Sequence, residues 1–194
     1  MTTKAPIETH LLSPFLPEGA RILMLGSFPP KRERWSMEFF YPNWINDMWR
    51  IFGLIFFGDK DHFVGDAKQF DRDRCAAFAA ERGIAMFDTA TQVRRLKDNA
   101  SDKFLEIVTP TDIAALLKEI PECSAIVTTG QKATDVIVDT YGCDEPEVGS
   151  FTKVIIDGRE LRFWRMPSSS RAYPLPLAKK AEPYRKMYET EHIL

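Results

Sequence analysis

Three short apolar runs, separated by segments with helical spacing, constrain the fold of this chain more than any other feature. The runs cover residues 21–25, 84–87 and 124–129, and their length and apolar character are typical of buried strands. Helical patterns lie between and after them, at residues 46–57, 68–82, 109–120 and 131–140. Because strands that alternate with helices form βαβ units, we expect a mostly parallel sheet with helices on both faces.

The two ends of the chain complete this expected architecture. Residues 1–19 contain three prolines and predict an irregular entry, with a short helix near residues 10–15. Residues 152–156 and 160–164, joined by Asp157-Gly158, predict a hairpin. The sequence therefore predicts an α/β fold, namely a three-layer α/β/α sandwich around a mostly parallel sheet of about four strands.

The length of 194 residues, 44% of them hydrophobic, suits the core of one domain, which we expect to span residues 1–194. A terminal helix is expected at residues 176–190, and Pro183 should shorten or kink it.

Charge is distributed unevenly along the chain. The net charge of −2 gives no support for nucleic-acid binding by the field of the whole molecule. However, residues 159–186 hold eight basic and two acidic residues, and Lys31 begins a second basic stretch at 31–34. Each basic stretch adjoins one of two loops described below. On charge alone, a solvated basic surface without a partner fits equally well.

Several classes of protein are disfavoured by the composition. Three cysteines without a C-x-x-C pair argue against a disulfide framework, and the three histidines show no metal-ligand spacing. Since no apolar run reaches the length of a membrane span, we expect no membrane association. We expect a reduced, cytoplasmic protein, monomeric and without metal or cofactor.

The first loop begins at Gly26, directly after the run at residues 21–25. It reads Gly26-Ser27-Phe28-Pro29-Pro30, and an aromatic pair, Phe40-Tyr41, follows it. Asn43 and Asn46 then precede the predicted helix at 46–57. A glycine after a strand indicates only a turn, so the aromatic and asparagine residues carry the added information.

The second loop follows the strand-like run at residues 161–165. Its residues are Pro167, Ser168, Ser169, Ser170 and Arg171. Hydroxyls and backbone N–H groups suit phosphate oxygens, and arginines at both ends add positive charge, although the composition is also that of an ordinary turn. In open α/β sheets ligands bind outside the carboxyl ends of the strands, so the two loops can converge on one pocket.

Together, the two loops resemble the active-site motifs of the uracil-DNA glycosylase superfamily, and most closely those of the mismatch-specific uracil and hypoxanthine-DNA glycosylase branches. The resemblance covers roughly residues 21–184. It implies a uracil-DNA glycosylase-like sandwich whose partner is DNA with a damaged base. The implied activity is that of a monofunctional DNA glycosylase in base excision repair. It would hydrolyse the N-glycosidic bond of a flipped-out uracil or hypoxanthine and leave an abasic site.

The resemblance also implies roles for residues around the first loop. Tyr41 or Phe40 would stack on the flipped base, while Asn46 or Asn43 would position the attacking water. Asp88, which follows the run at 84–87, would accept a hydrogen bond from a ring N–H of the base. The remaining expected contacts are with the base, by Gly26, Ser27 and Phe28, and with DNA, by Lys31, Arg165, Pro167, Ser168, Ser169, Ser170 and Arg171.

Each of these residues also has a purely structural interpretation. The aromatic residues suit a hydrophobic core, and Asn46 suits a helix N-cap. Asp88 could cap a loop or pair with Arg94 or Arg95.

The sequence departs from the family pattern at two positions. Many members have an Asp or Asn where this chain has Phe28, and some have a histidine where it has Met166. These departures favour a first alternative, a non-catalytic member of the same fold that binds nucleic acid or a nucleobase. A second alternative is a small-molecule α/β hydrolase that uses Ser168–Ser170, although no nucleophile-elbow motif is present.

Overall fold

A computed structural model of the protein describes residues 5–97 and 101–194. Its central sheet has five strands in the order β3-β2-β6-β8-β7, and four of them run parallel. The fifth, β7, forms an antiparallel hairpin with β8, at the place where the sequence predicts a hairpin. The strands are β3 (Ile84–Asp88), β2 (Ile22–Gly26), β6 (Ala125–Thr129), β8 (Arg159–Met166) and β7 (Ser150–Ile156).

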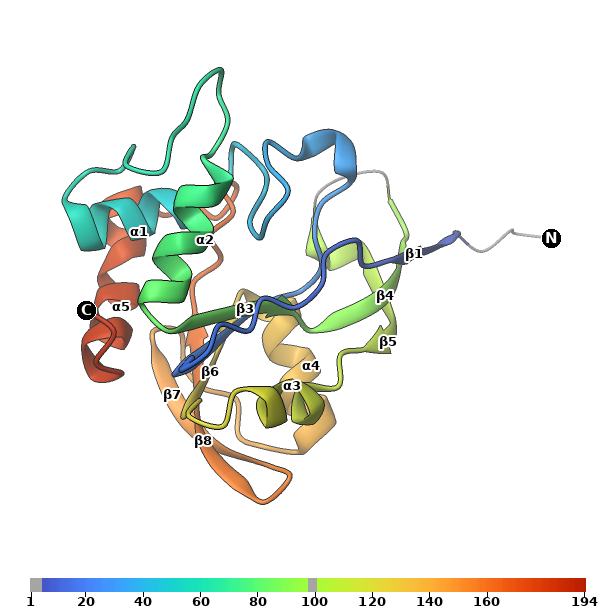
Figure 1. Cartoon of the computed structure of the whole chain (residues 1–194). Coiled ribbons are helices and arrows are strands. Elements are labelled where there is room, and N and C mark those ends of the chain that lie inside the picture. Colours follow the sequence, from blue (N-terminus) through green and yellow to red (C-terminus); the bar gives the residue numbers. More distant parts are fainter. Residues whose placement is uncertain (1–4, 98–100) are drawn as a thin grey trace.

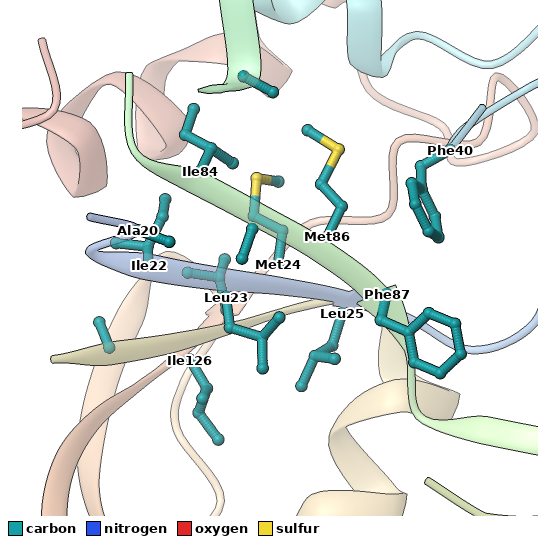
Figure 2. Close-up of a cluster of buried hydrophobic side chains, with 14 of the residues drawn as sticks. Ala20, Ile22, Leu23, Met24, Leu25, Phe40, Ile84, Met86, Phe87 and Ile126 are labelled. Atoms are coloured by element: carbon teal, nitrogen blue, oxygen red, sulfur yellow. The ribbon is translucent and has the colours of Figure 1, made fainter. Parts of the chain in front are cut away.

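Three of the parallel strands, β2, β3 and β6, form because nearly all of their residues are apolar and can be buried on both faces of the sheet. Every residue of β2, β3 and β6 is buried. Figure 2 shows the side chains of Met24 and Met86 on one face, and those of Leu23, Leu25 and Ile126 on the other. A continuous apolar run is the pattern expected for parallel strands that are covered twice.

Helices cover both faces of this sheet (Figure 1). On one side lie α1 (Met48–Phe57), α2 (Arg72–Glu81) and α5 (Leu177–Thr190), and on the other lie α3 (Ile113–Glu119) and α4 (Gln131–Tyr141). Tyr188 of α5 reaches the Met24 face, with its hydroxyl 3.6 Å from the sulfur. Thr134 of α4 contacts the opposite face through the hydroxyl of Thr128, at 2.8 Å. The mixed α/β class is therefore confirmed.

Two helix starts follow from capping carboxylates. The side chain of Asp71 accepts a hydrogen bond from the Arg74 N–H before α2, and that of Asp112 accepts one from Ala115 before α3. Such caps satisfy backbone N–H groups that have no partner within the helix. Pro183 does not end α5, which runs through it to Thr190.

A second, three-stranded antiparallel sheet was not expected from the sequence. It consists of β1 (Ile7–Thr9), β4 (Ala90–Arg95) and β5 (Leu105–Pro110), in the order β1-β4-β5. Short 3-10 turns occur at Arg32–Arg34 and Asp102–Phe104. The helix expected at residues 109–120 begins only after Asp112, because Thr109 and Pro110 belong to β5.

The short helix expected near residues 10–15 is also absent from this described segment. Its backbone is irregular, and Phe15 instead forms a bridge with Met86 at the edge of the central sheet. Two backbone hydrogen bonds hold this bridge, at 3.0 and 2.9 Å. The N-terminal segment is thus attached both to β3 and, through β1, to β4.

Candidate functional site

The four parallel strands all end at one pocket with a volume of about 920 Å³. The last residues of β2, β3, β6 and β8 line it, and these are Gly26, Asp88, Thr129 and Met166. Both loops singled out in the sequence contribute to its wall. The expected base-contacting and water-positioning residues in the lining are Gly26, Ser27, Phe28, Phe40, Tyr41, Asn43, Asn46 and Asp88.

The expected DNA-contacting residues divide into two groups. Arg165 and the loop residues Pro167, Ser168, Ser169 and Ser170 line the pocket. Lys31 and Arg171 lie outside the lining, although each adjoins a loop that forms it. The side chain of Arg165 is engaged by Glu145, at 2.6 Å, and by Gln131, so its charge is partly compensated within the protein.

Asp88 and Gly26 occupy paired positions at the ends of neighbouring strands. A side chain at position 26 could not fit, because its Cβ would lie 2.4 Å from Oδ1 of Asp88. Only glycine allows the carboxylate to lie over the backbone of the first loop. This close approach places Asp88 Oδ1 at the pocket wall.

The second oxygen of Asp88 is held by a histidine. His10 Nε2 lies 2.8 Å from Oδ2 of Asp88, and the His10 side chain is only 3% exposed. The structure therefore differs from the suggested pairing of Asp88 with Arg94 or Arg95. Arg94 pairs with Glu106 instead, and Arg95 with Glu8.

Arg95 is a buried cation in the pocket wall that sequence reasoning did not select as a site residue. Its guanidinium donates to both carboxylate oxygens of Glu8, at 3.2 and 3.1 Å, and to the carbonyl of Pro29, at 3.2 Å. The first loop is therefore tied to β4 and, through Glu8, to β1. The short, mostly polar sequence of β4 gave little signal for this role.

Asp102 supplies a second carboxylate to the pocket lining. Burial raises the pKa of Asp102, a hydrogen bond from Ser27 lowers it, and the nearby charge of Asp88 raises it again. The positive charges of Arg95 and Lys132 act in the opposite direction. The sequence around Asp102 shows no motif, so only the fold identifies it.

The two candidate stacking residues differ in their surroundings. Phe40 is 4% exposed and packs against Phe39 and Phe87, as a core residue does. Tyr41 is less buried, adopts a positive φ of 52°, and lies with its hydroxyl 3.4 Å from that of Thr129. Burial raises the pKa of the Tyr41 phenol, so it is neutral at physiological pH. Of the two rings, that of Tyr41 is better placed to meet a ligand.

The two asparagines use their side-chain oxygens locally. Asn46 Oδ1 accepts a hydrogen bond from the Met48 N–H, the first of α1, at 2.9 Å, and Asn43 Oδ1 accepts one from Ile45 at 3.2 Å. The N-cap residue of α1 is Asp47 rather than Asn46, but the Asp47 side chain makes no capping hydrogen bond, so Asn46 serves this capping function from the preceding position. An amide whose oxygen is engaged in this way offers its NH₂ group to a ligand, as a donor that can orient water but cannot remove its proton.

Hydrogen bonds from α5 and from the residue before α1 hold the backbone of the second loop. Lys180 Nζ donates to the Ser170 carbonyl at 3.0 Å, and the Tyr184 hydroxyl donates to the Pro167 carbonyl at 2.6 Å. The Asp47 N–H donates to the Ser169 carbonyl at 2.8 Å. These contacts fix the loop, so its hydroxyls and N–H groups are presented with little freedom.

Within residues 5–97 and 101–194, no cluster of three or more histidine, cysteine, aspartate or glutamate residues could hold a metal ion. In the same part of the chain, no helix is both long and apolar enough to cross a membrane. The polar groups in the pocket lining include the carboxylates of Asp88, Asp102 and Asp135 and the side-chain amides of Asn43, Asn46 and Gln131.

The fold is similar to that of a solved structure, the solution NMR structure of a "putative Uracil DNA glycosylase" from Methanosarcina acetivorans. The similarity has a TM-score of 0.65, covers 96% of this chain and 99% of that chain, and comes with 18% sequence identity. No protein-family model matches the sequence, and no curated protein matches it. At this level of identity the similarity establishes the fold: this chain folds like that protein.

Proposed function

We propose that this protein is a monofunctional DNA glycosylase that releases a deaminated base, uracil or hypoxanthine, from DNA. The observation that carries the proposal is the convergence of both loops on one pocket, which brings together the Tyr41 ring, the Asp88 carboxylate and the Asn46 amide. The similarity of the fold to the archaeal structure supports the same class of function.

The geometry suits recognition of a flipped base. A base must leave the DNA stack before its glycosidic bond can be attacked, and its face then needs a platform, here the Tyr41 ring. Stacking on an aromatic ring contributes about 1–3 kcal/mol per base. Uracil N3–H and hypoxanthine N1–H are donors, and Asp88 Oδ1 is an acceptor at the pocket wall. The carboxylate thus favours bases that present a ring N–H.

In the proposed reaction a water molecule attacks C1′ of the sugar as the bond from C1′ to the base nitrogen breaks. The bonding electrons leave with the base, which gains a proton, and the attacking water loses one, so that the products are the free base and an abasic site. Asn46 would hold the water through its NH₂ group, so it contributes by placement rather than as a base. The N–H and hydroxyl groups of the second loop would bind the flanking phosphates.

A specific observation favours the non-catalytic alternative. Phe28 and Met166, which stand where the family often has polar residues, are 8% and 1% exposed and pack as apolar residues. A protein that binds a nucleobase without cleaving DNA would not need a polar residue at either position. The hydrolase alternative has less support, because no histidine is among the lining residues that the structure describes and Ser168 Oγ instead accepts from the Ser170 N–H.

The proposal is tested with labelled oligonucleotides that carry uracil or hypoxanthine, both paired and single-stranded, followed by alkaline cleavage of abasic sites. Lesion-dependent cleavage by the wild type supports the glycosylase. DNA binding without cleavage of any substrate would overturn it in favour of the non-catalytic alternative. Gln69→Ala, in the exposed loop before α2, serves as a control that should cleave like the wild type.

A further inference from the structure

His10 is a buried side chain to which neither the motifs nor the proposed function assigns a role. We propose that it is a positioning residue, which acts through Asp88 to hold one carboxylate oxygen at the edge of the bound base. The inference rests on the proposed function, because it specifies how the base would be recognised.

The placement of His10 separates it from direct contact with a ligand. His10 is absent from the described pocket lining, whereas Asp88, to which it is bonded, is part of it. The imidazole lies against Phe87, with ring centroids 4.6 Å apart, and meets the edge of Phe28 at 5.3 Å. These rings hold the imidazole behind the carboxylate.

The two oxygens of Asp88 consequently have different surroundings. Oδ2 is bonded to His10 Nε2 at 2.8 Å, while Oδ1 lies over Gly26, which lines the pocket. With Oδ2 occupied, the carboxylate cannot rotate freely about its χ2 torsion. Oδ1 is therefore the acceptor presented to the ring N–H of a base.

The other ring nitrogen determines the orientation of the imidazole. His10 Nδ1 lies 3.1 Å from the Leu12 N–H and 3.0 Å from the Leu12 carbonyl. A neutral imidazole accepts from the N–H through Nδ1, and an imidazolium donates to the carbonyl. In both states Nε2 carries a proton and donates to Asp88, so the contact survives either form.

His10 reaches this position because the N-terminal segment follows the edges of both sheets. The His10 N–H donates to the Thr91 carbonyl at 2.8 Å, and Phe15 pairs with Met86 on β3. Glu8 on the same segment holds Arg95, which is also in the pocket wall. The N-terminal segment thus supports both Asp88 and Arg95 from outside the pocket.

Two substitutions that each introduce a side-chain amide, His10→Gln and His10→Asn, test the role of His10. A glutamine amide can place its nitrogen near the position of Nε2, whereas the shorter asparagine amide reaches only the position of Nδ1. His10→Gln therefore preserves a donor to Asp88, and His10→Asn does not. Thr9→Ala, an exposed neighbour on the same segment, is the control.

Base release is measured in single turnovers with enzyme in excess, and binding to abasic-site DNA by fluorescence anisotropy. His10→Asn should slow release by about tenfold to a hundredfold, because Asp88 Oδ1 is then no longer held in the orientation that the base requires. His10→Gln and Thr9→Ala should stay within about threefold of the wild type, and abasic-site binding should change in none of them by more than about threefold.

A double-mutant cycle distinguishes positioning from a general effect on folding. Once Asp88→Ala has removed the side-chain oxygens, adding His10→Asn should slow release by less than about twofold further. Equal losses in His10→Gln and His10→Asn, a wild-type rate in His10→Asn, or multiplicative losses in the double variant would each overturn the inference while leaving the glycosylase in place.

Failure of the proposed function gives a different result, namely no base release by the wild type. The variants His10→Asn and His10→Gln are then compared under the nucleobase-binding alternative, by isothermal titration with free uracil and free hypoxanthine. His10→Asn should weaken binding by about tenfold and His10→Gln should not. Equal binding by the two variants, or no binding by the wild type, overturns the positioning role.

Discussion

Lys180 Nζ lies 3.1 Å from Asp47 Oδ2, and this buried ion pair joins α5 to the residue that precedes α1. The Lys180 side chain is fully buried, and that of Asp47 is 9% exposed. Because Lys180 also donates to the Ser170 carbonyl, one side chain connects both the start of α1 and the second loop to the terminal helix.

Replacing Lys180 by methionine should lower the free energy of unfolding by about 3 kcal/mol, since a buried carboxylate then loses its main partner. Lys179→Met is the matched control, because Lys179 is exposed and pairs with Glu182 at the surface. That change should cost less than about 0.5 kcal/mol. Urea denaturation measures both, and equal stability of the two variants would show that the buried pair contributes little.

Gly26→Ala should impair base release more than stability. The added Cβ would lie 2.4 Å from Asp88 Oδ1, so the carboxylate must move away from the pocket wall. We expect a loss of about a hundredfold in the rate of base release, as for a misplaced catalytic group. At Gly65 the nearest atoms lie 3.6 Å from an added Cβ, so Gly65→Ala should retain the wild-type rate. Equal rates for the two variants would contradict the assigned position of Asp88.

Asn46 has a capping role and a proposed water-positioning role, and substitutions can separate them. Asn46→Ala should remove nearly all base release and destabilise the protein by about 1 kcal/mol through loss of the cap. Asn46→Ser retains a capping oxygen but lacks the NH₂ group, so it should keep wild-type stability and still lose activity. Thermal denaturation and single-turnover assays provide the two readouts. An active Asn46→Ser variant would show that the residue is only a cap.

Stability should depend on pH through Asp102. Burial raises the pKa of Asp102 in the folded state, so its proton is held more tightly there than in the unfolded chain. The resulting stabilisation is present below the unfolded pKa, about 3.9, and is lost as pH rises through the folded pKa. Asp102→Asn should therefore unfold at a higher temperature than the wild type near neutral pH, and this difference should shrink toward pH 4.

The control for this comparison is Asp139→Asn, on the exposed side of α4. Thermal unfolding followed by circular dichroism across the pH range measures both variants. A stabilising effect of Asp102→Asn that does not change with pH would contradict the titration of this carboxyl.

The parts of the fold that the sequence predicted are those with strong local signals. Within the run at residues 21–25, every residue after Arg21 is apolar, and all five residues of β2 are buried, so composition alone identifies the strand. In contrast, β4 carries polar side chains at most positions, and Gln92 and Arg94 are only half-buried. The second sheet depends on pairing between distant segments, which no local pattern reveals.

The same distinction applies to the candidate site. The loop residues were found because their order along the chain resembles a known pair of motifs. His10 and Asp88 are separated by 78 positions, so their contact could not be inferred from spacing. For Lys180, the only signal is a lysine beside Ala181 and Tyr184 on the buried face of α5. Its partner Asp47 lies 133 positions away and becomes evident only in the fold.

In the proposed function the pocket releases a base whose ring N–H donates a hydrogen bond to Asp88. It is tested most directly by measuring the free base released from oligonucleotides that contain either uracil or its N3-methyl derivative, and either hypoxanthine or its N1-methyl derivative. Mass spectrometry of the released base under single-turnover conditions provides the readout. We expect release of at least one unmodified base and a loss of about a hundredfold or more for its methylated form, since a buried acceptor is then left without a donor. Release of neither unmodified base, or equal release of a base and its methylated form, would contradict it.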